Sequence, residues 1–250
     1  MDMPIRARKV ADAPRPDRKA DILLAAEKLF AQRGYHAVTI RQIAEEAGVP
    51  LALVGYYYGP KHELFHAIFV HWSSTIDERL LALKKVGIDP QDANTLPRII
   101  DAFVGPVLRL RASSEGEYYA LLVARELYHL QDETDRVMRT YFDPLAMAFI
   151  DALNLALPQA TRAQVAWVYQ FALGALLHHI SDTRVKRLSK GESRQGDPAA
   201  ALLLAHFIVG GIRAALVSGP APAPAPQALA SSPQTSPFSS PLSTHRRPHS

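Results

Sequence analysis

The chain has 250 residues, 48% of them hydrophobic, with a formal net charge of +4 and a pI of about 9.3. This length predicts a small domain and a larger one, and the mild basicity suits a partner that carries phosphate. Because the sequence has no cysteine, it excludes a disulfide framework and any zinc site built on cysteine.

The first segment, residues 1–16, is charged and contains proline, and we predict a disordered basic arm. Arg6, Arg8, Lys9 and Arg15 outnumber its acidic residues. Such an arm is either a solvated tail or a source of additional minor-groove and phosphate contacts. It lacks the apolar core of a signal peptide, and no apolar stretch of the chain reaches the uninterrupted length of a transmembrane helix. The cytoplasm is therefore the expected location, without a membrane partner.

The next segment predicts a helix that Gly34 ends. Its apolar stripe recurs at helical spacing and consists of Ile22, Leu23, Ala26, Leu29 and Phe30. A second, short helix begins after Thr39, since Gln42 follows three residues later and completes a capping box. Val38 and Ile43 can form the hydrophobic staple that flanks such a cap. Gly48 then stops this helix.

A third helix begins directly after Gly48, with Pro50 at its start. Two short helices joined by a tight turn with glycine form a helix-turn-helix, whose second helix can enter a major groove. The first helix can cover the small core of this motif. The alternative is an ordinary helical bundle with a chance glycine turn.

The rest of the chain predicts further helices and no strands, so we expect an all-α fold. A long helix runs from Pro60 to about Lys84, and others follow at residues 96–110, 117–130, 134–157, 162–181 and 198–217. Breakers such as Gly87, Pro90 and Pro158 separate them. The predicted domains are residues 17–77 and 78–218, and the Pro/Ala/Ser-rich residues 219–250 are expected to be disordered.

Blocks in the first third of the chain resemble the tetracycline-repressor-like (TetR) family of transcriptional regulators. They are Ile22-Leu23, Ala25-Ala26, Leu29-Phe30, Gly34-Tyr35, Thr39-Ile40, Ala47-Gly48-Val49, Tyr57-Tyr58-Gly59-Pro60-Lys61 and Leu64-Phe65. Their order and spacing are specific to that family. The resemblance implies a homodimer that binds a double-stranded DNA operator and responds to a small-molecule effector.

The resemblance also implies roles for single residues. Thr39 matches a cap that touches a backbone phosphate, Arg41 a residue that reaches a base edge or phosphate, and Lys61 a lysine that pairs with phosphate; arginine and lysine suit these tasks chemically. The expected DNA-binding residues are Thr39, Arg41, Pro50, Leu51, Ala52, Leu53, Gly55, Tyr56, Tyr57 and Lys61.

The recognition helix departs from the family pattern at two positions. Pro50 stands where a Ser, Thr or Asn usually caps the helix, and Gly55 stands where the family usually has Tyr, Asn or another contact residue. Glycine inside a helix costs about 1 kcal/mol against alanine. Base recognition is therefore expected to rely on Arg41 and on contacts from the apolar Leu51–Leu53 with thymine methyl groups.

One motif offers an enzymatic alternative. His62-Glu63-Leu64-Phe65-His66 has the H-E-x-x-H spacing of zinc proteases, in which both histidines share a helix face. A catalytic zinc needs a further ligand, and His71 lies two to three turns from His62. The preferred interpretation has no enzyme activity, cofactor or metal, with a zinc-dependent hydrolase as the alternative.

The segment 117–130 carries polar groups on one helix face, so we predict an effector site there. Arg125 on such a face needs a partner, either a carboxylate of Asp101, Glu126 or Asp143, or an acidic ligand. The expected ligand-binding residues are Tyr118, Leu122, Arg125, His129, Phe171 and His178. His178 is adjacent to His179, and adjacent residues do not face each other on a helix, so a metal pair is not expected.

Two helices near the end of the chain carry stripes with small residues, at positions 171–178 and 201–212. They either pack internally or, as the resemblance implies, form an intermolecular four-helix bundle. The preferred interpretation is a homodimeric repressor that releases a near-palindromic operator when an apolar or amphipathic effector binds. A constitutive DNA-binding protein, whose second domain serves dimerisation alone, is a further alternative.

Overall fold

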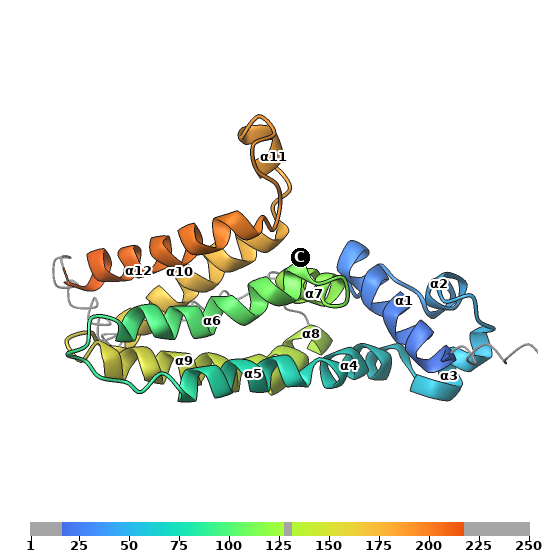
Figure 1. Ribbon diagram of the computed structural model, residues 1–250. Helices are drawn as coiled ribbons and strands as arrows, with labels where there is room; N and C mark the ends of the chain where they lie inside the picture. The colour runs from blue at the N-terminus through green and yellow to red at the C-terminus, as the bar shows by residue number, and fades with distance from the viewer. Residues whose placement is uncertain (1–16, 128–131, 218–250) are drawn as a thin grey trace, which may run out of the picture. The chain divides into compact units, whose positions relative to one another are not determined.

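A computed structural model of the chain describes residues 17–127 and 132–217, and these are all-α, as predicted (Figure 1). The expected N-terminal arm, the expected C-terminal tail and His129 lie outside the described residues. The helices are α1 (Arg18–Arg33), α2 (Ile40–Glu46), α3 (Leu51–Tyr58), α4 (Lys61–His71), α5 (Ser73–Lys84), α6 (Thr95–Ala112), α7 (Glu117–Glu126), α8 (Asp132–Val137), the π-helical turn η1 (Met138–Phe142), α9 (Asp143–Ala156), α10 (Arg162–Ser181), α11 (Val185–Leu188), the 3-10 turn η2 (Pro198–Ala200) and α12 (Ala201–Val217).

Two hydrophobic cores organise the helices. The first joins α1–α4 to α7 and η1, with Phe30, Phe65 and Phe69 fully buried at its centre. The second lies among α5, α6, α9, α10 and α12, and Phe103 and Phe149 meet in it edge to face. Helix α7 packs along α1 as well as against α6 and α10, so it connects the two cores.

The predicted long helix from Pro60 to Lys84 is interrupted at Trp72. The backbone there has φ −95° and ψ 7°, and α4 ends where α5 begins. The indole of Trp72 donates a hydrogen bond to Glu27 and stacks on Tyr119. The Thr75 hydroxyl also donates to the Trp72 carbonyl. Contacts with other helices therefore fix this break, and the helical periodicity of the segment does not reveal them.

The predicted helix over residues 134–157 is interrupted as well, by the π-helical turn η1. Pro144 follows this turn and has no backbone N–H, so it cannot donate to the carbonyl of Thr140 four residues earlier, and its ring would clash there. The backbone therefore takes the wider π-helical turn, with hydrogen bonds between residues five apart, before α9 begins. Such local π turns are frequent at functional sites, and this one borders a cavity described below.

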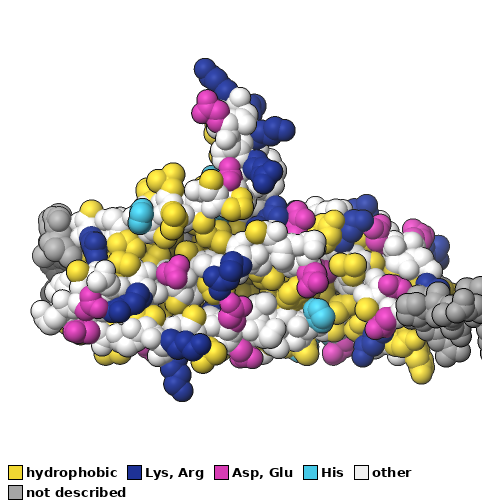
Figure 2. Space-filling model, in the orientation of Figure 1, with side chains coloured by type: hydrophobic (Ala, Val, Ile, Leu, Met, Phe, Trp, Pro, Cys, Tyr) yellow, Lys and Arg dark blue, Asp and Glu magenta, His cyan; other side chains and the backbone are white. Residues whose placement is uncertain are grey.

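One described helix, Pro198–Leu216, is long and apolar enough by composition to cross a membrane, with a mean hydropathy of 1.9. The expectation that no such stretch exists is thus wrong. Ile208 and Ile212 of this helix are buried in the second core, whereas Leu203 and Phe207 on its other side are exposed. Figure 2 shows hydrophobic side chains over α10 and α12, and basic side chains on the projecting segment around α11.

Candidate functional site

The second short helix of the helix-turn-helix, α3, exposes one face and anchors the other. Val54 is fully buried beneath it, and the Tyr58 hydroxyl donates to the Lys19 carbonyl of α1 at 2.8 Å. Leu51 and Tyr56 of the same helix are 46% and 80% exposed. Their neighbours Pro50, Ala52, Gly55 and Tyr57 are exposed too, whereas Leu53 is half-buried. The helix thus presents a mainly apolar and aromatic surface to solvent.

The caps of α2 and α3 follow the sequence prediction. The Gln42 amide donates to the Thr39 hydroxyl at 3.3 Å, and the Thr39 amide donates to the Gln42 side chain at 2.9 Å. Gly48 has φ +62°, which glycine adopts without steric cost. Pro50 begins α3 without a side-chain cap. Arg41 is exposed in the first turn of α2, the helix that packs against α3.

Lys61, at the start of α4, is already engaged within the module. Its ammonium donates to the carbonyls of Tyr35 and Val38 at 2.8 and 2.9 Å and lies 4.3 Å from the centre of the Tyr35 ring. Burial lowers the pKa of Lys61. An ammonium has three N–H donors, so at most one remains for a phosphate. Lys61 therefore ties α4 to the loop between α1 and α2.

A buried polar cluster lies where α1, α4, α5 and α7 meet. Glu27 is 2% exposed and accepts a hydrogen bond from the Trp72 indole at 2.8 Å. The indole stacks on the Tyr119 ring, with centroids 5.3 Å apart. Burial raises the pKa of Glu27 to about 7, although the hydrogen bonds from Trp72 and the Tyr119 backbone oppose the rise. Glu27 is thus a titratable group at the junction of the two cores.

Because the pKa of Glu27 is raised in the folded state, the contribution of Glu27 to the free energy of unfolding depends on pH. The folded state binds the proton more tightly than the unfolded chain, so this contribution is fully present below pH 4.5 and is lost as pH rises through about 7. The difference between the pKa values of Glu27 in the folded and unfolded states corresponds to roughly 3 kcal/mol at most. In urea unfolding, Glu27→Gln is expected to gain stability over wild type as pH rises from 5 to 8, while Glu45→Gln, at an exposed position of α2, keeps the wild-type slope. Parallel slopes for all three proteins would contradict this assignment.

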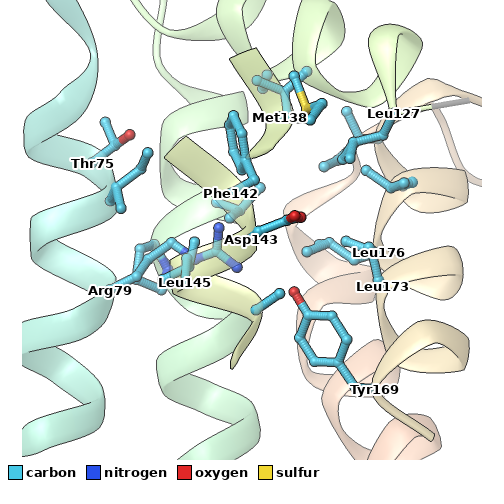
Figure 3. A pocket seen from close by; sticks show the side chains of 18 of the residues that line it. Thr75, Arg79, Leu127, Met138, Phe142, Asp143, Leu145, Tyr169, Leu173 and Leu176 are labelled. Carbon is cyan, nitrogen blue, oxygen red and sulfur yellow. The ribbon is translucent and has the colours of Figure 1, made fainter. Parts of the chain in front are cut away.

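A cavity of about 710 Å³ lies between α5, α6, α7, η1, α9 and α10. Its size is within the range of small-molecule sites. The apolar lining includes Val107, Leu110, Val123, Leu127, Met138, Phe142, Leu145, Leu173, Leu176 and Ile180. The polar lining includes Thr75, Arg79, Tyr119, Asp135, Arg139, Asp143, Tyr169 and Gln170. Figure 3 shows the Arg79 guanidinium reaching into this space, near Phe142 and Asp143.

The structure does not bring the predicted ligand-binding residues together at this cavity. Leu122 is fully buried in the core shared with α1–α4, and Tyr118 packs against the same core. Phe171 is 65% exposed, and His178 pairs with Asp182 at 2.9 Å on the surface. The predicted face of α7 is displaced by about one residue, since Tyr119, Val123 and Leu127 line the cavity instead.

Among the described residues, Arg125 pairs with none of the carboxylates predicted for it, Asp101, Glu126 and Asp143. It is exposed, and its guanidinium donates to the carbonyls of Gln32 and Arg33, at 3.4 and 3.3 Å. These carbonyls lie at the end of α1, where a cation is favourable. A Cβ at Gly34 would lie 2.9 Å from Arg125 Nε, and Gly34 has φ +84°, so both space and backbone favour glycine there. Arg125 therefore attaches α7 to α1.

Sequence reasoning missed Arg79, the buried cation of the cavity. A signal was present, because Arg79 stands three residues after Ile76 and four before Leu83, on the apolar face of α5. An arginine on an apolar helix face needs a partner, and this holds for Arg79 as it does for Arg125. Tyr119 and Tyr169 are likewise buried at the cavity wall.

The H-E-x-x-H segment makes other contacts. His62 Nε2 lies 3.3 Å from Glu63 Oε1, and His66 Nε2 lies 3.0 Å from the Tyr141 hydroxyl. Among the described residues, no group of three or more potential ligands converges on a metal position. The zinc-hydrolase alternative therefore has no support.

An exposed apolar surface runs over α10 and α12, which pack against each other. Trp167 and Phe171 stack with centroids 5.7 Å apart, on consecutive turns of α10. The surface consists of Trp167, Phe171, Leu202, Leu203 and Phe207, each more than 60% exposed. We call it the α10/α12 face. Large exposed apolar side chains gathered on two neighbouring helices are typical of an interaction site.

The chain combines a helix-turn-helix that presents a recognition helix with a helical domain that contains a cavity. This combination defines a transcriptional regulator with a DNA-binding domain and a separate second domain. Two family models match the chain: the tetR family of bacterial regulatory proteins at residues 22–68, and the tetracyclin repressor-like C-terminal domain at residues 101–211. Together these matches show that the chain belongs to the TetR family of DNA-binding regulators.

Individual relatives agree with this family. The chain is 35% identical to the HTH-type transcriptional regulator HbdR of Aromatoleum sp. (strain CIB) over 94 residues, which are 38% of this chain and 34% of that protein. It is 28% identical to the regulator BetI of Brucella canis over 151 residues, 60% of this chain and 73% of BetI. The fold matches a TetR-family regulator from Bordetella parapertussis 12822 with a TM-score of 0.57 at 17% identity, over 78% of this chain and 95% of that one. The chain thus spans about a third of the length of HbdR.

Proposed function

We propose that the protein is a homodimeric repressor that releases its operator when a small apolar or amphipathic effector occupies the cavity. The observation that carries this proposal is that the cavity and the core of α1–α4 have side chains in common. Tyr119 and Met138 line the cavity, and both belong to the core that holds α1–α4 together. A molecule that displaces these side chains would also disturb the support of the helix-turn-helix.

The route from the cavity to the DNA-binding module is short. Tyr119 stacks on Trp72, and Trp72 stands at the break between α4 and α5 and donates to Glu27 of α1. Thr75, just after the break, also lines the cavity. An effector can shift the equilibrium between two placements of the module only by its differential affinity for them, and contacts at this junction supply such a difference.

Two subunits joined through the α10/α12 face would present two recognition helices to DNA. A near-palindromic operator with half-sites roughly 34–36 Å apart then matches the two-fold symmetry of the dimer. The proposed DNA surface consists of Thr39, Arg41, Pro50, Leu51, Ala52, Leu53, Gly55, Tyr56 and Tyr57, with Lys61 in a mainly structural role. Such a regulator would act in the cytoplasm.

Selection of genomic fragments by the purified full-length protein tests this function. We expect enrichment of fragments with inverted half-sites one helical turn apart, and their release by a compound from an effector screen. Arg41→Glu serves as the control for binding through the helix-turn-helix. Enrichment without release by any compound would favour constitutive DNA binding, and equal enrichment by the Arg41→Glu variant would exclude the proposed DNA surface.

A further inference from the structure

Arg79 is a buried cation whose hydrogen-bonding capacity is incompletely used. It projects from α5, is 8% exposed and lines the cavity. Its Nε, buried from solvent, has no hydrogen-bond partner within the described residues. The guanidinium carbon lies 5.1 Å from the centre of the Phe103 ring and 5.7 Å from that of Phe149. Ring faces attract a cation but accept none of the directed N–H bonds that a planar guanidinium offers.

The charged groups around the cavity leave Arg79 without a paired anion. Asp135 is engaged with Arg139 at 2.7 Å. Asp143 lines the same cavity, yet no ion pair joins Arg79 to any carboxylate in the described part of the chain. Tyr119 and Tyr169 lie close enough to influence the guanidinium, but they are neutral at physiological pH. A buried charge without a partner is costly, so an anion from outside would be strongly favoured here.

The rest of the cavity indicates what accompanies that anion. Beyond Arg79 the lining includes Phe142, Met138, Leu127, Leu173 and Leu176, which Figure 3 labels around the same space. These side chains offer an apolar channel and no directed polar contact. An occupant that satisfies both ends carries a negatively charged group at one end and an alkyl or aryl body at the other.

We propose that the effector is an amphipathic carboxylic acid whose carboxylate forms a bidentate pair with Arg79 and whose apolar body fills the channel toward Leu127. The planar fork of a guanidinium matches the two oxygens of a carboxylate. This inference rests on the proposed function, because it assumes that the cavity is the effector site. It assigns to Arg79 the anion-binding role that the sequence suggested for Arg125.

Calorimetric titration of the full-length protein with decanoate, decanol and decyltrimethylammonium tests the ligand class. The three probes share an alkyl chain and differ in the charge of the head group. We expect decanoate to bind at least about tenfold more tightly than decanol, and the ammonium to bind weakest. The Arg79→Met variant keeps an apolar side chain of similar length and is expected to bind decanoate and decanol equally. Arg109→Met, at an exposed position of α6 that pairs with Glu78 and does not line the cavity, is expected to keep the preference.

The outcomes separate the ligand class from the function. Equal binding of decanoate and decanol by wild type, or a preference that survives Arg79→Met, would overturn the carboxylate assignment. If decanoate binds through Arg79 but leaves operator binding unchanged, the assignment stands and the proposed effector response fails. Should Arg79→Met not fold, the comparison of the three probes on wild type still decides, and Arg79→Lys is expected to lower the preference for decanoate while it retains the charge.

Discussion

Replacing Leu203 and Phe207 together with glutamate is expected to convert the protein from a dimer to a monomer and to lower operator affinity by at least about 100-fold. Both side chains are about 70% exposed and belong to the α10/α12 face, which also includes the stacked Trp167 and Phe171. Burying one such side chain contributes about 1.5–3 kcal/mol, and two glutamates per subunit would place four unpaired charges within the interface. A monomer contacts one half-site alone and loses the advantage of linked binding.

Sedimentation equilibrium and operator titration on the same samples measure the two effects. Leu81→Glu is the matched control, because Leu81 is 52% exposed on α5, away from this face. The control is expected to remain dimeric and to bind the operator like wild type. A double variant that stays dimeric with an unchanged melting temperature would show that the α10/α12 face is not the interface.

The parts of the fold that were predictable from sequence are those that local interactions determine. The capping box of Thr39 and Gln42, the left-handed Gly48 and the helix start at Pro50 each depend on residues within a few positions. The bounds of α10 at Arg162 and Ser181 also agree with the prediction. There the cap of Thr161 and Gln164 forms a second capping box, and local hydrogen bonds again fix the start of the helix.

The parts that were not predictable depend on which helix faces which. The break between α4 and α5 coincides with the contacts of Trp72 with Glu27 and Tyr119, which are distant in sequence and which the helical periodicity does not reveal. On α7, both Tyr118 and Tyr119 pack in the core shared with α1, and only Tyr119 also lines the cavity. A rotation of about one residue therefore moved the expected site from the cavity to an interface between helices.

Arg125 and Arg79 illustrate the same ambiguity for charged side chains. Each is an arginine on a partly apolar helix face, and the sequence does not say which one meets a neighbouring backbone and which meets an internal space. In the structure Arg125 donates to carbonyls at the end of α1, while Arg79 lies over aromatic rings at the cavity wall. A buried arginine needs a partner, and the buried one of the two is Arg79.

Reversing the charge of Arg41 is expected to have the largest effect on DNA binding within the helix-turn-helix. Arg41 is exposed on α2 next to the recognition helix. The surface of α3 itself offers Leu51, Ala52 and Tyr56 and no cation, so Arg41 carries the proposed charged contact. One good arginine–base pair is worth about 1–3 kcal/mol, and a dimer has two such residues. Arg41→Glu is therefore expected to lower operator affinity on the order of 100-fold or more.

Fluorescence anisotropy with the selected operator, at several salt concentrations, measures this effect. Arg187→Glu on α11 is the matched control, since it changes the net charge equally at an exposed position outside the module. It is expected to cost less than about threefold, because exposed charges beyond a Debye length are screened. Lys61→Met provides a contrast, since its ammonium holds two carbonyls of the module, and it is expected to lower the melting temperature as well as the affinity. Equal losses for Arg41→Glu and Arg187→Glu would mean that DNA binding depends on overall charge, and the proposed surface around α3 would be wrong.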